Sequence, residues 1–327
     1  MLSDILGQQK AVSYLQKLVC QNRVPGALLF SGPGGVGKKK TALEFAKALN
    51  CEDFFARQNG EACGACPSCQ AIDKGTHPDV TLVDFIYQAR LTAKAGADEE
   101  DLEKEVEKQQ HISVDTVRNI AAKSQQKAAR SGWKVLIMDK AETMQAAAAN
   151  ALLKFIEEPP AKTVWILITS KRATMLPTIL SRCQPVLFAP LTEPDVAKLL
   201  QTHAPEVTEP MRAARYSGGS VSGALQAAEA LELLESGGFG TVTGPAQVAA
   251  QLSRTAVTAR REAQAVLDVL VTALHEKWAA CDESERTTLQ CTLKQFENYK
   301  RSIGRNVSPA LVLETALMSL DGLDVKL

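Results

Sequence analysis

The chain has 327 residues, of which 45% are hydrophobic, and its 37 basic residues balance its 37 acidic ones. This length and composition predict a globular protein of two or three domains, and the balanced charge excludes a general basic surface for nucleic acid or membranes. No segment is apolar for long enough to span a bilayer and the N-terminal residues lack a secretion signal, so we expect a cytoplasmic protein without membrane contacts.

A glycine-rich stretch follows a helical pattern at residues 8–21 and an apolar run at residues 27–30, and a second helical pattern follows it to about residue 50. The stretch fits the phosphate-loop template Gly-x-x-x-x-Gly-Lys, in which backbone N–H groups surround an anion and Lys38 reaches its outer phosphates. Its glycines are Gly32, Gly34, Gly35 and Gly37. The template continues with a hydroxyl residue that holds Mg²⁺, but this chain has Lys39 there.

Four of the eight cysteines lie within residues 51–69. They are Cys51, Cys63, Cys66 and Cys69. Two overlapping C-x-x-C steps bring three thiolates to one ion, and Cys51 completes a tetrahedral set, which favours structural Zn²⁺ in a reducing compartment. The alternative is a group of unrelated buried or redox-active cysteines. We expect this module to support the surface beside the phosphate loop.

A short strand at residues 79–84 comes next. Residues near 88–110 are polar and rich in acidic residues, and we interpret them as an exposed insertion with some helical character. Ser113 is then a suitable N-cap for a helix that continues to about residue 129.

The apolar run at residues 133–139 ends at Asp139, as does the second nucleotide-binding motif of P-loop ATPases. Asp139 would face the metal ion of such a site. Those ATPases continue with a glutamate that activates water, whereas this chain has Lys140, and a cation cannot be that base. A buried strand with a terminal capping residue is the other interpretation of Asp139.

An alanine-rich helix at residues 146–158 and a buried strand at residues 163–169 follow. Arg182 then lies on a short helix or loop before a further strand at residues 184–188. By itself it indicates only a surface or ion-paired arginine. A helical segment at residues 189–235, a glycine-rich break and a second helical segment at residues 244–327 complete the chain.

Several motifs together resemble the bacterial DNA polymerase III clamp-loader subunits of the AAA+ family, over about residues 1–230. They are residues 7–8, the glycine loop, the four cysteines, residues 150–154 with 157–160, and residues 176–179 with 181–183. The resemblance implies a RecA-like α/β AAA+ P-loop domain at residues 1–188, with a parallel sheet between helices. It also implies a small helical lid domain at residues 189–235 and a helical collar domain for oligomerisation at residues 244–327.

Within this family, the gamma/tau subunits hydrolyse ATP and the delta-prime subunit generally does not. Lys39, Lys140 and Ser222 stand where the ATPase subunits carry the Mg²⁺-binding hydroxyl, the catalytic glutamate and a sensing arginine. Loss of a single transition-state group costs about a hundredfold or more in rate, so we expect no intrinsic ATPase activity. The chain therefore resembles delta-prime most closely. We favour a phosphate loop retained for folding over one that binds ATP.

The resemblance also implies that Arg182 acts in trans, as an arginine finger on the ATP of a neighbouring subunit. The implied partners are gamma/tau and delta subunits in a hetero-pentameric ring of the DNA polymerase holoenzyme, which loads the sliding clamp on primer-template DNA. A gamma/tau-like ATPase with atypical motifs is the alternative. A third class is a nucleotide-binding adaptor outside replication.

Overall fold

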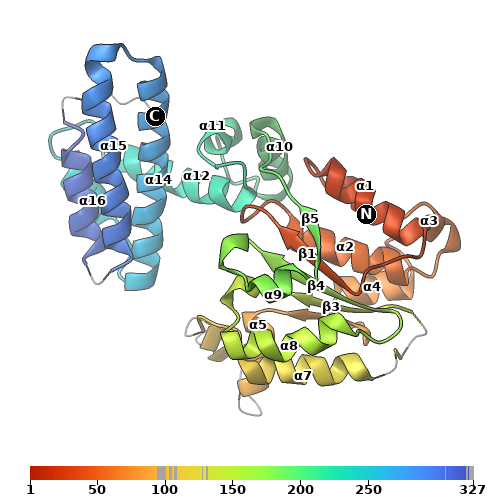
Figure 1. Cartoon of the computed structure of the whole chain (residues 1–327). Coiled ribbons are helices and arrows are strands. Elements are labelled where there is room, and N and C mark those ends of the chain that lie inside the picture. Colours follow the sequence, from red (N-terminus) through yellow and green to blue (C-terminus); the bar gives the residue numbers. More distant parts are fainter. Residues whose placement is uncertain are drawn as a thin grey trace. The chain divides into compact units, whose positions relative to one another are not determined.

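The computed structural model describes residues 1–93, 101–102, 105–106, 109–126, 128–129, 132–305, 307–321 and 323. It divides into two compact units, Met1–Pro190 and Leu191–Leu327 (Figure 1). The segments expected to form the lid and the collar both belong to the second unit. None of the described helices combines the length and the apolar composition that a membrane-spanning helix requires.

The described residues of the first unit form a five-stranded parallel sheet in the order β2-β3-β4-β1-β5. Its strands are β1 (Ala27–Ser31), β2 (Val80–Val83), β3 (Lys134–Met138), β4 (Thr163–Thr169) and β5 (Gln184–Leu187). Every residue of β1, β3 and β4 is buried, because helices cover both faces of the sheet. The expected fold class, a parallel sheet between helices followed by a helical region, is confirmed.

Helices α1 and α2 lie on one side of this sheet, and α7 and α8 lie on the other (Figure 1). The helices of the first unit are α1 (Gln9–Cys20), α2 (Lys38–Asn50), α3 (Phe54–Gln58), α4 (Pro67–Asp73), α5 (Phe85–Thr92), α7 (Val114–Gln125), α8 (Ala146–Glu157) and α9 (Pro177–Leu180). On the α7–α8 side, Leu136 and Trp165 pack against Ile120 and Leu152. The alternate residues of the same strands are equally buried on the α2 side.

Side-chain caps set the start of two helices. The hydroxyl of Ser113 accepts a hydrogen bond from Thr116 N at 3.2 Å, so the predicted N-cap of α7 is present. Asp84 caps α5 in the same way, through Tyr87 N at 3.0 Å. The caps explain why the two helices begin directly after Ser113 and Asp84.

The exposed insertion that we expected from residue 88 begins later in the chain, because Gln88 is a buried residue of α5. Its Oε1 accepts hydrogen bonds from Ser113 N at 2.8 Å and Thr116 Oγ1 at 2.9 Å, and its Nε2 donates to His111 O at 3.0 Å. This polar side chain tolerates burial because its amide is fully bonded. Residues 94–100, 103–104 and 107–108 of the expected insertion lie outside the described residues.

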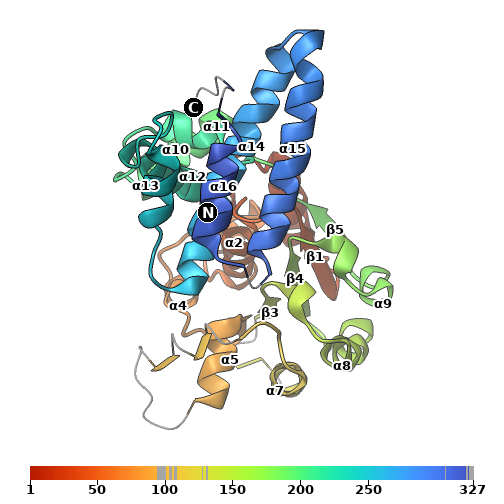
Figure 2. The same ribbon diagram turned by 90° about the vertical axis from the view of Figure 1, so that its left-hand side faces the viewer.

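The second unit is helical throughout its described residues. Its helices are α10 (Glu193–His203), α11 (Pro210–Arg215), α12 (Val221–Ser236), α13 (Gly244–Ala250), α14 (Ala256–Ala280), α15 (Glu283–Ile303) and α16 (Pro309–Met318). The long helices α14 and α15 run side by side (Figure 2). Leu231 and Leu234 of α12 share one hydrophobic core with Leu270 and Phe296 of these two helices. The lid and collar segments are therefore joined by a continuous core.

We predict that Trp165→Ala lowers the free energy of unfolding by about 3–5 kcal/mol, because it leaves a cavity in the middle of the sheet. Trp165 is fully buried on β4, and its Nε1 has no hydrogen-bond partner among the described residues. Trp165→Phe is the matched control, since it keeps an aromatic ring and removes no such bond. Urea unfolding followed by circular dichroism measures the difference, and equal losses for both variants would contradict this placement of the core.

Candidate functional site

Polar residues follow four neighbouring strands at one edge of the sheet. In parallel strands the carboxyl ends lie on the same edge, which is where open α/β sheets bind their ligands. The strand order places Asp84 after β2, Asp139 after β3, Ser170 after β4 and the glycine loop after β1. The loop and Asp139 are therefore separated by one strand, and Ser170 lies at the end of that strand.

Two glycines of the phosphate-loop motif are required by the backbone itself. A Cβ atom on Gly32 would lie 2.3 Å from the carbonyl oxygen of Phe188, so no larger residue fits there. Gly37 has a φ of 94° and is the N-cap of α2, a conformation that L-residues with side chains rarely adopt. Gly34 and Gly35 lie between them in the loop.

Lys38 is buried and is turned toward its own loop. Its Nζ donates hydrogen bonds to Gly32 O at 2.7 Å, to Pro33 O and to Ser170 Oγ at 3.2 Å. Burial lowers the pKa of Lys38, and the carboxylates of Glu142 and Asp139 oppose this shift. A phosphate could meet this ammonium group only after it released the loop carbonyls.

Lys39 points to the carboxylates at the ends of the next two strands. Its Nζ lies 2.9 Å from Asp84 Oδ2 and 3.6 Å from Asp139 Oδ2. The structure therefore brings together Lys39 and Asp139, both singled out in the sequence, and adds Asp84. The ion pairs also compensate for a cation at the N-terminus of α2, where the helix dipole is positive.

The residues after Asp139 offer no carboxylate at the position of a catalytic glutamate. Lys140 has a φ of 51°, and its Nζ lies 5.2 Å from the centre of the Phe85 ring. Glu142 is turned toward the end of β4, where its Oε1 accepts a hydrogen bond from Ser170 N at 3.2 Å. A cavity of about 190 Å³ opens at this edge, and its lining residues are Lys39, Asp84, Phe85, Ile86, Val106, Asp139 and Lys140.

The site also contains three residues that the phosphate-loop and strand-end motifs did not predict. They are Asp84, Glu142 and Ser170. Asp84 carried a usable signal, because it ends an apolar run just as Asp139 does. Ser170 likewise comes directly after a strand. Their proximity to Lys38 and Lys39 depends on the strand order, which the sequence pattern does not specify.

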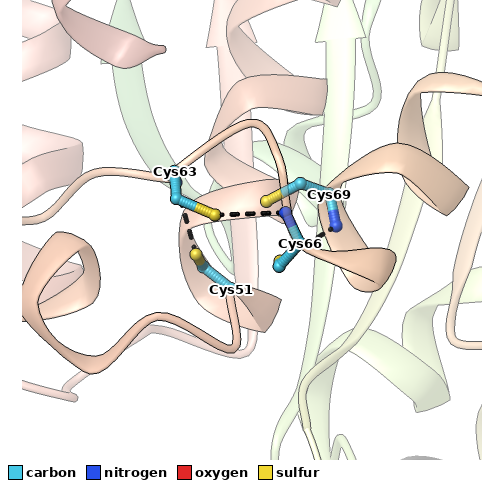
Figure 3. A group of neighbouring side chains, drawn as sticks. All are labelled: Cys51, Cys63, Cys66 and Cys69. Carbon is cyan, nitrogen blue, oxygen red and sulfur yellow. Dashed lines mark hydrogen bonds between the residues drawn. The ribbon is translucent and has the colours of Figure 1, made fainter.

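The four predicted cysteine ligands converge at one point. All four Sγ atoms lie within 4.8 Å of one another (Figure 3). Cys51 is the C-cap of α2, Cys63 lies in the following loop, and Cys66 is the N-cap of α4, one turn before Cys69. Backbone N–H groups donate to three of the sulfurs at 3.3–3.4 Å.

This donor set fits a tetrahedral zinc ion, for which Zn–S bonds of about 2.3 Å place sulfurs about 3.8 Å apart. Burial would raise the pKa of Cys66, but hydrogen bonds, chiefly from the backbone of Glu52 and Cys69, lower it to about 7. Burial raises the pKa of Cys51 and Cys69. A metal ion bound here would therefore displace protons from at least these two thiols.

We expected the cysteine module to lie beside the phosphate loop, but the structure places the two at opposite ends of α2. Cys51 follows the last residue of α2, whereas the loop precedes its first residue, and this helix has 13 residues. At 1.5 Å per residue the two sites are about 20 Å apart along the helix. Glu61, close to Cys63 in sequence, instead accepts hydrogen bonds from Leu2 N at 2.8 Å and Gln16 Nε2 at 2.7 Å. The module therefore supports the N-terminal segment and α1.

Arg182 lies just after α9. None of its described contacts is with a residue of the glycine loop or of the strand ends beside it. Its Nε forms an ion pair with Glu157 at the end of α8, and its Nη1 donates to Thr178 O at 3.1 Å. Both charged side chains are exposed, at 39% and 43%. An adjacent open cavity of about 300 Å³ is lined by Arg182, Glu157, Pro159 and the start of β1.

The parallel sheet with a phosphate-loop motif at its carboxyl edge defines the class of P-loop α/β proteins. Residues 7–192 match the family model described as "DNA polymerase III, delta subunit", and the chain belongs to this family. The expected membership among the bacterial DNA polymerase III clamp-loader subunits of the AAA+ class is thereby confirmed.

Curated relatives include delta′ and tau subunits of DNA polymerase III. The delta′ subunit of Pseudomonas aeruginosa is 38% identical over 157 residues, which are 48% of this chain and 41% of that protein. The delta′ subunit of Bacillus subtilis is 31% identical over 222 residues, 64% of this chain and 59% of that protein. The tau subunit of Bacillus subtilis is 33% identical over 189 residues, 58% of this chain and 29% of that protein.

The matched region thus spans less than two thirds of each of these relatives. A solved structure of a DNA polymerase III gamma subunit-related protein from Thermotoga maritima aligns with a TM-score of 0.49 at 18% identity, covering 94% of this chain and 97% of that chain.

We predict that Cys51→Ser reduces the zinc content of the purified chain by at least about tenfold, because the fourth thiolate of the tetrahedral set is lost. Elemental analysis by mass spectrometry, after purification without chelators, gives the measurement. Cys20→Ser is the matched control, since Cys20 is exposed at the end of α1 and outside the cluster. Equal zinc contents in the two variants would contradict a metal site at these cysteines.

Proposed function

We propose that the chain is a delta-prime-type subunit of the DNA polymerase III clamp loader. In this role it does not hydrolyse ATP, it supplies Arg182 to the ATP of a neighbouring subunit, and it helps to load the sliding clamp on primed DNA. The observation that carries the proposal is a pair of lysines, Lys39 and Lys140, at the positions where an ATPase needs a metal-binding hydroxyl and a general base.

The contacts of the phosphate loop support the absence of hydrolysis. Lys39 is held by Asp84 and Asp139, and Lys38 is held by the loop carbonyls. Ser222, at the position of the sensing arginine, is an exposed residue in the first turn of α12. We therefore propose that Gly32, Gly34, Gly35, Gly37, Lys38 and Asp139 are the retained frame of a degenerate nucleotide site.

The setting of Arg182 supports a role in trans. Its ion pair with Glu157 joins two exposed side chains, and such pairs contribute only about 0–1 kcal/mol. The guanidinium group can therefore exchange this carboxylate for a phosphate at little cost. An arginine favours such a site because its charge is permanent and its planar donors match phosphate oxygens.

The remaining parts of the proposal follow from the family. The partners are gamma/tau and delta subunits in a hetero-pentameric ring, and clamp and primer-template DNA are reached through this complex. The zinc ion at the four cysteines is structural, because four thiolates fill all four tetrahedral positions and leave none open for catalysis. A cytoplasmic location belongs to the same proposal.

The gamma/tau-like ATPase is the second candidate, and the tau relatives favour it. Steady-state ATP turnover by the isolated chain separates the two. We predict no turnover above that of a Lys38→Ala variant, because neither a metal-binding hydroxyl nor a general base is present. Turnover that Lys38→Ala abolishes would instead establish a hydrolysing subunit.

We predict that Arg182→Ala lowers ATP turnover at the neighbouring site of the reconstituted loader by about a hundredfold or more, while assembly is unchanged. DNA-stimulated ATPase assays and size-exclusion chromatography measure the two effects. Arg172→Ala is the matched control, because Arg172 is also an exposed arginine near α9, but it lies before this helix and Arg182 lies after it. Full turnover with Arg182→Ala would remove the finger role.

A further inference from the structure

The ammonium group of Lys39 lies between two carboxylates at the carboxyl edge of the sheet. It is 2.9 Å from Asp84 Oδ2 and 3.6 Å from Asp139 Oδ2. The two carboxylates are largely buried, with side-chain exposures of 18% and 21%, while Lys39 is 42% exposed. A positive charge is thus already bound between two inward-facing acids.

This setting coincides with the place of a divalent cation in a working phosphate loop. The residue directly after the loop lysine supplies a hydroxyl ligand to Mg²⁺, and an aspartate at the end of a nearby strand faces the same ion. Here those positions are Lys39 and Asp139. Asp84 adds a second carboxylate because β2 is the neighbour of β3 in the sheet.

Among the described residues, the other two lysines of the site form no ion pair with Asp84 or Asp139. Lys38 donates to the loop carbonyls Gly32 O and Pro33 O, and Lys140 lies over the ring of Phe85 at 5.2 Å. Lys39 is therefore the cation that compensates Asp84 and Asp139. A dication at the same point would meet an ammonium group of like charge in a partly buried, low-dielectric setting.

We propose that Lys39 is a built-in replacement for Mg²⁺, which closes the divalent-cation site formed by Asp84 and Asp139. The side chain neutralises the two carboxylates without any bound metal and prevents metal from binding there. Replacing Lys39 by a residue with a hydroxyl group opens the site, because it removes the ammonium group and restores the missing ligand. This inference rests on the phosphate-loop geometry and not on the role of Arg182.

The test is Mn²⁺ binding to the isolated zinc-loaded chain, followed by the electron paramagnetic resonance signal of free hydrated Mn²⁺. We predict that Lys39→Thr binds an additional Mn²⁺ ion, with an apparent dissociation constant at least about tenfold lower than that of the wild-type chain. Lys39→Arg is the matched control, because it keeps the positive charge and therefore binds no additional ion. Thermal melts establish that the variants are folded.

The double variant Lys39→Thr with Asp139→Asn tests the location of the added ion. Loss of one carboxylate removes the gain, because Mg²⁺ and Mn²⁺ need anionic oxygen ligands. Retention of the gain in this variant would overturn the proposal. Equal Mn²⁺ binding by the wild-type and Lys39→Thr chains would do so as well. The wild-type chain gives a further check: an Mn²⁺ site in it that Asp139→Asn abolishes overturns the proposal directly.

Discussion

The order of the parallel strands is the constraint on which the candidate site depends. Because β4 lies between β1 and β3, Ser170 separates the glycine loop from Asp139, and its hydroxyl is available to Lys38. Because β2 lies beside β3, Asp84 and Asp139, which directly follow these strands, lie next to each other. Helices on both faces bury β1, β3 and β4 completely, so the polar groups at their ends are held in fixed positions.

Charge compensation explains the arrangement at the start of α2. Three consecutive lysines begin this helix, where the helix dipole already contributes a partial positive charge. The structure stabilises the first through loop carbonyls and the second through Asp84 and Asp139. In an ATPase, phosphates and Mg²⁺ would fill this region. In this chain the loop carbonyls bind Lys38, and Asp84 and Asp139 bind Lys39.

The four cysteines and Arg182 lie away from that frame. The four cysteines form a compact cluster at the far end of α2, where they secure the connection to the N-terminal segment. Arg182 is exposed and bound only to neighbouring groups at the ends of α8 and α9. The proposed action of Arg182 in trans requires an accessible side chain, and this side chain is 39% exposed.

The sequence by itself determined the local features. Glycines at fixed spacing indicated the loop, C-x-x-C steps indicated the metal cluster, and apolar runs indicated the strands, because each depends on residues close in the chain. Family membership followed from the same motifs. Only the tertiary structure decided that Asp84 pairs with Lys39 and that Gln88 is buried. These facts depend on strand order and helix packing, which bring together residues that no local pattern connects.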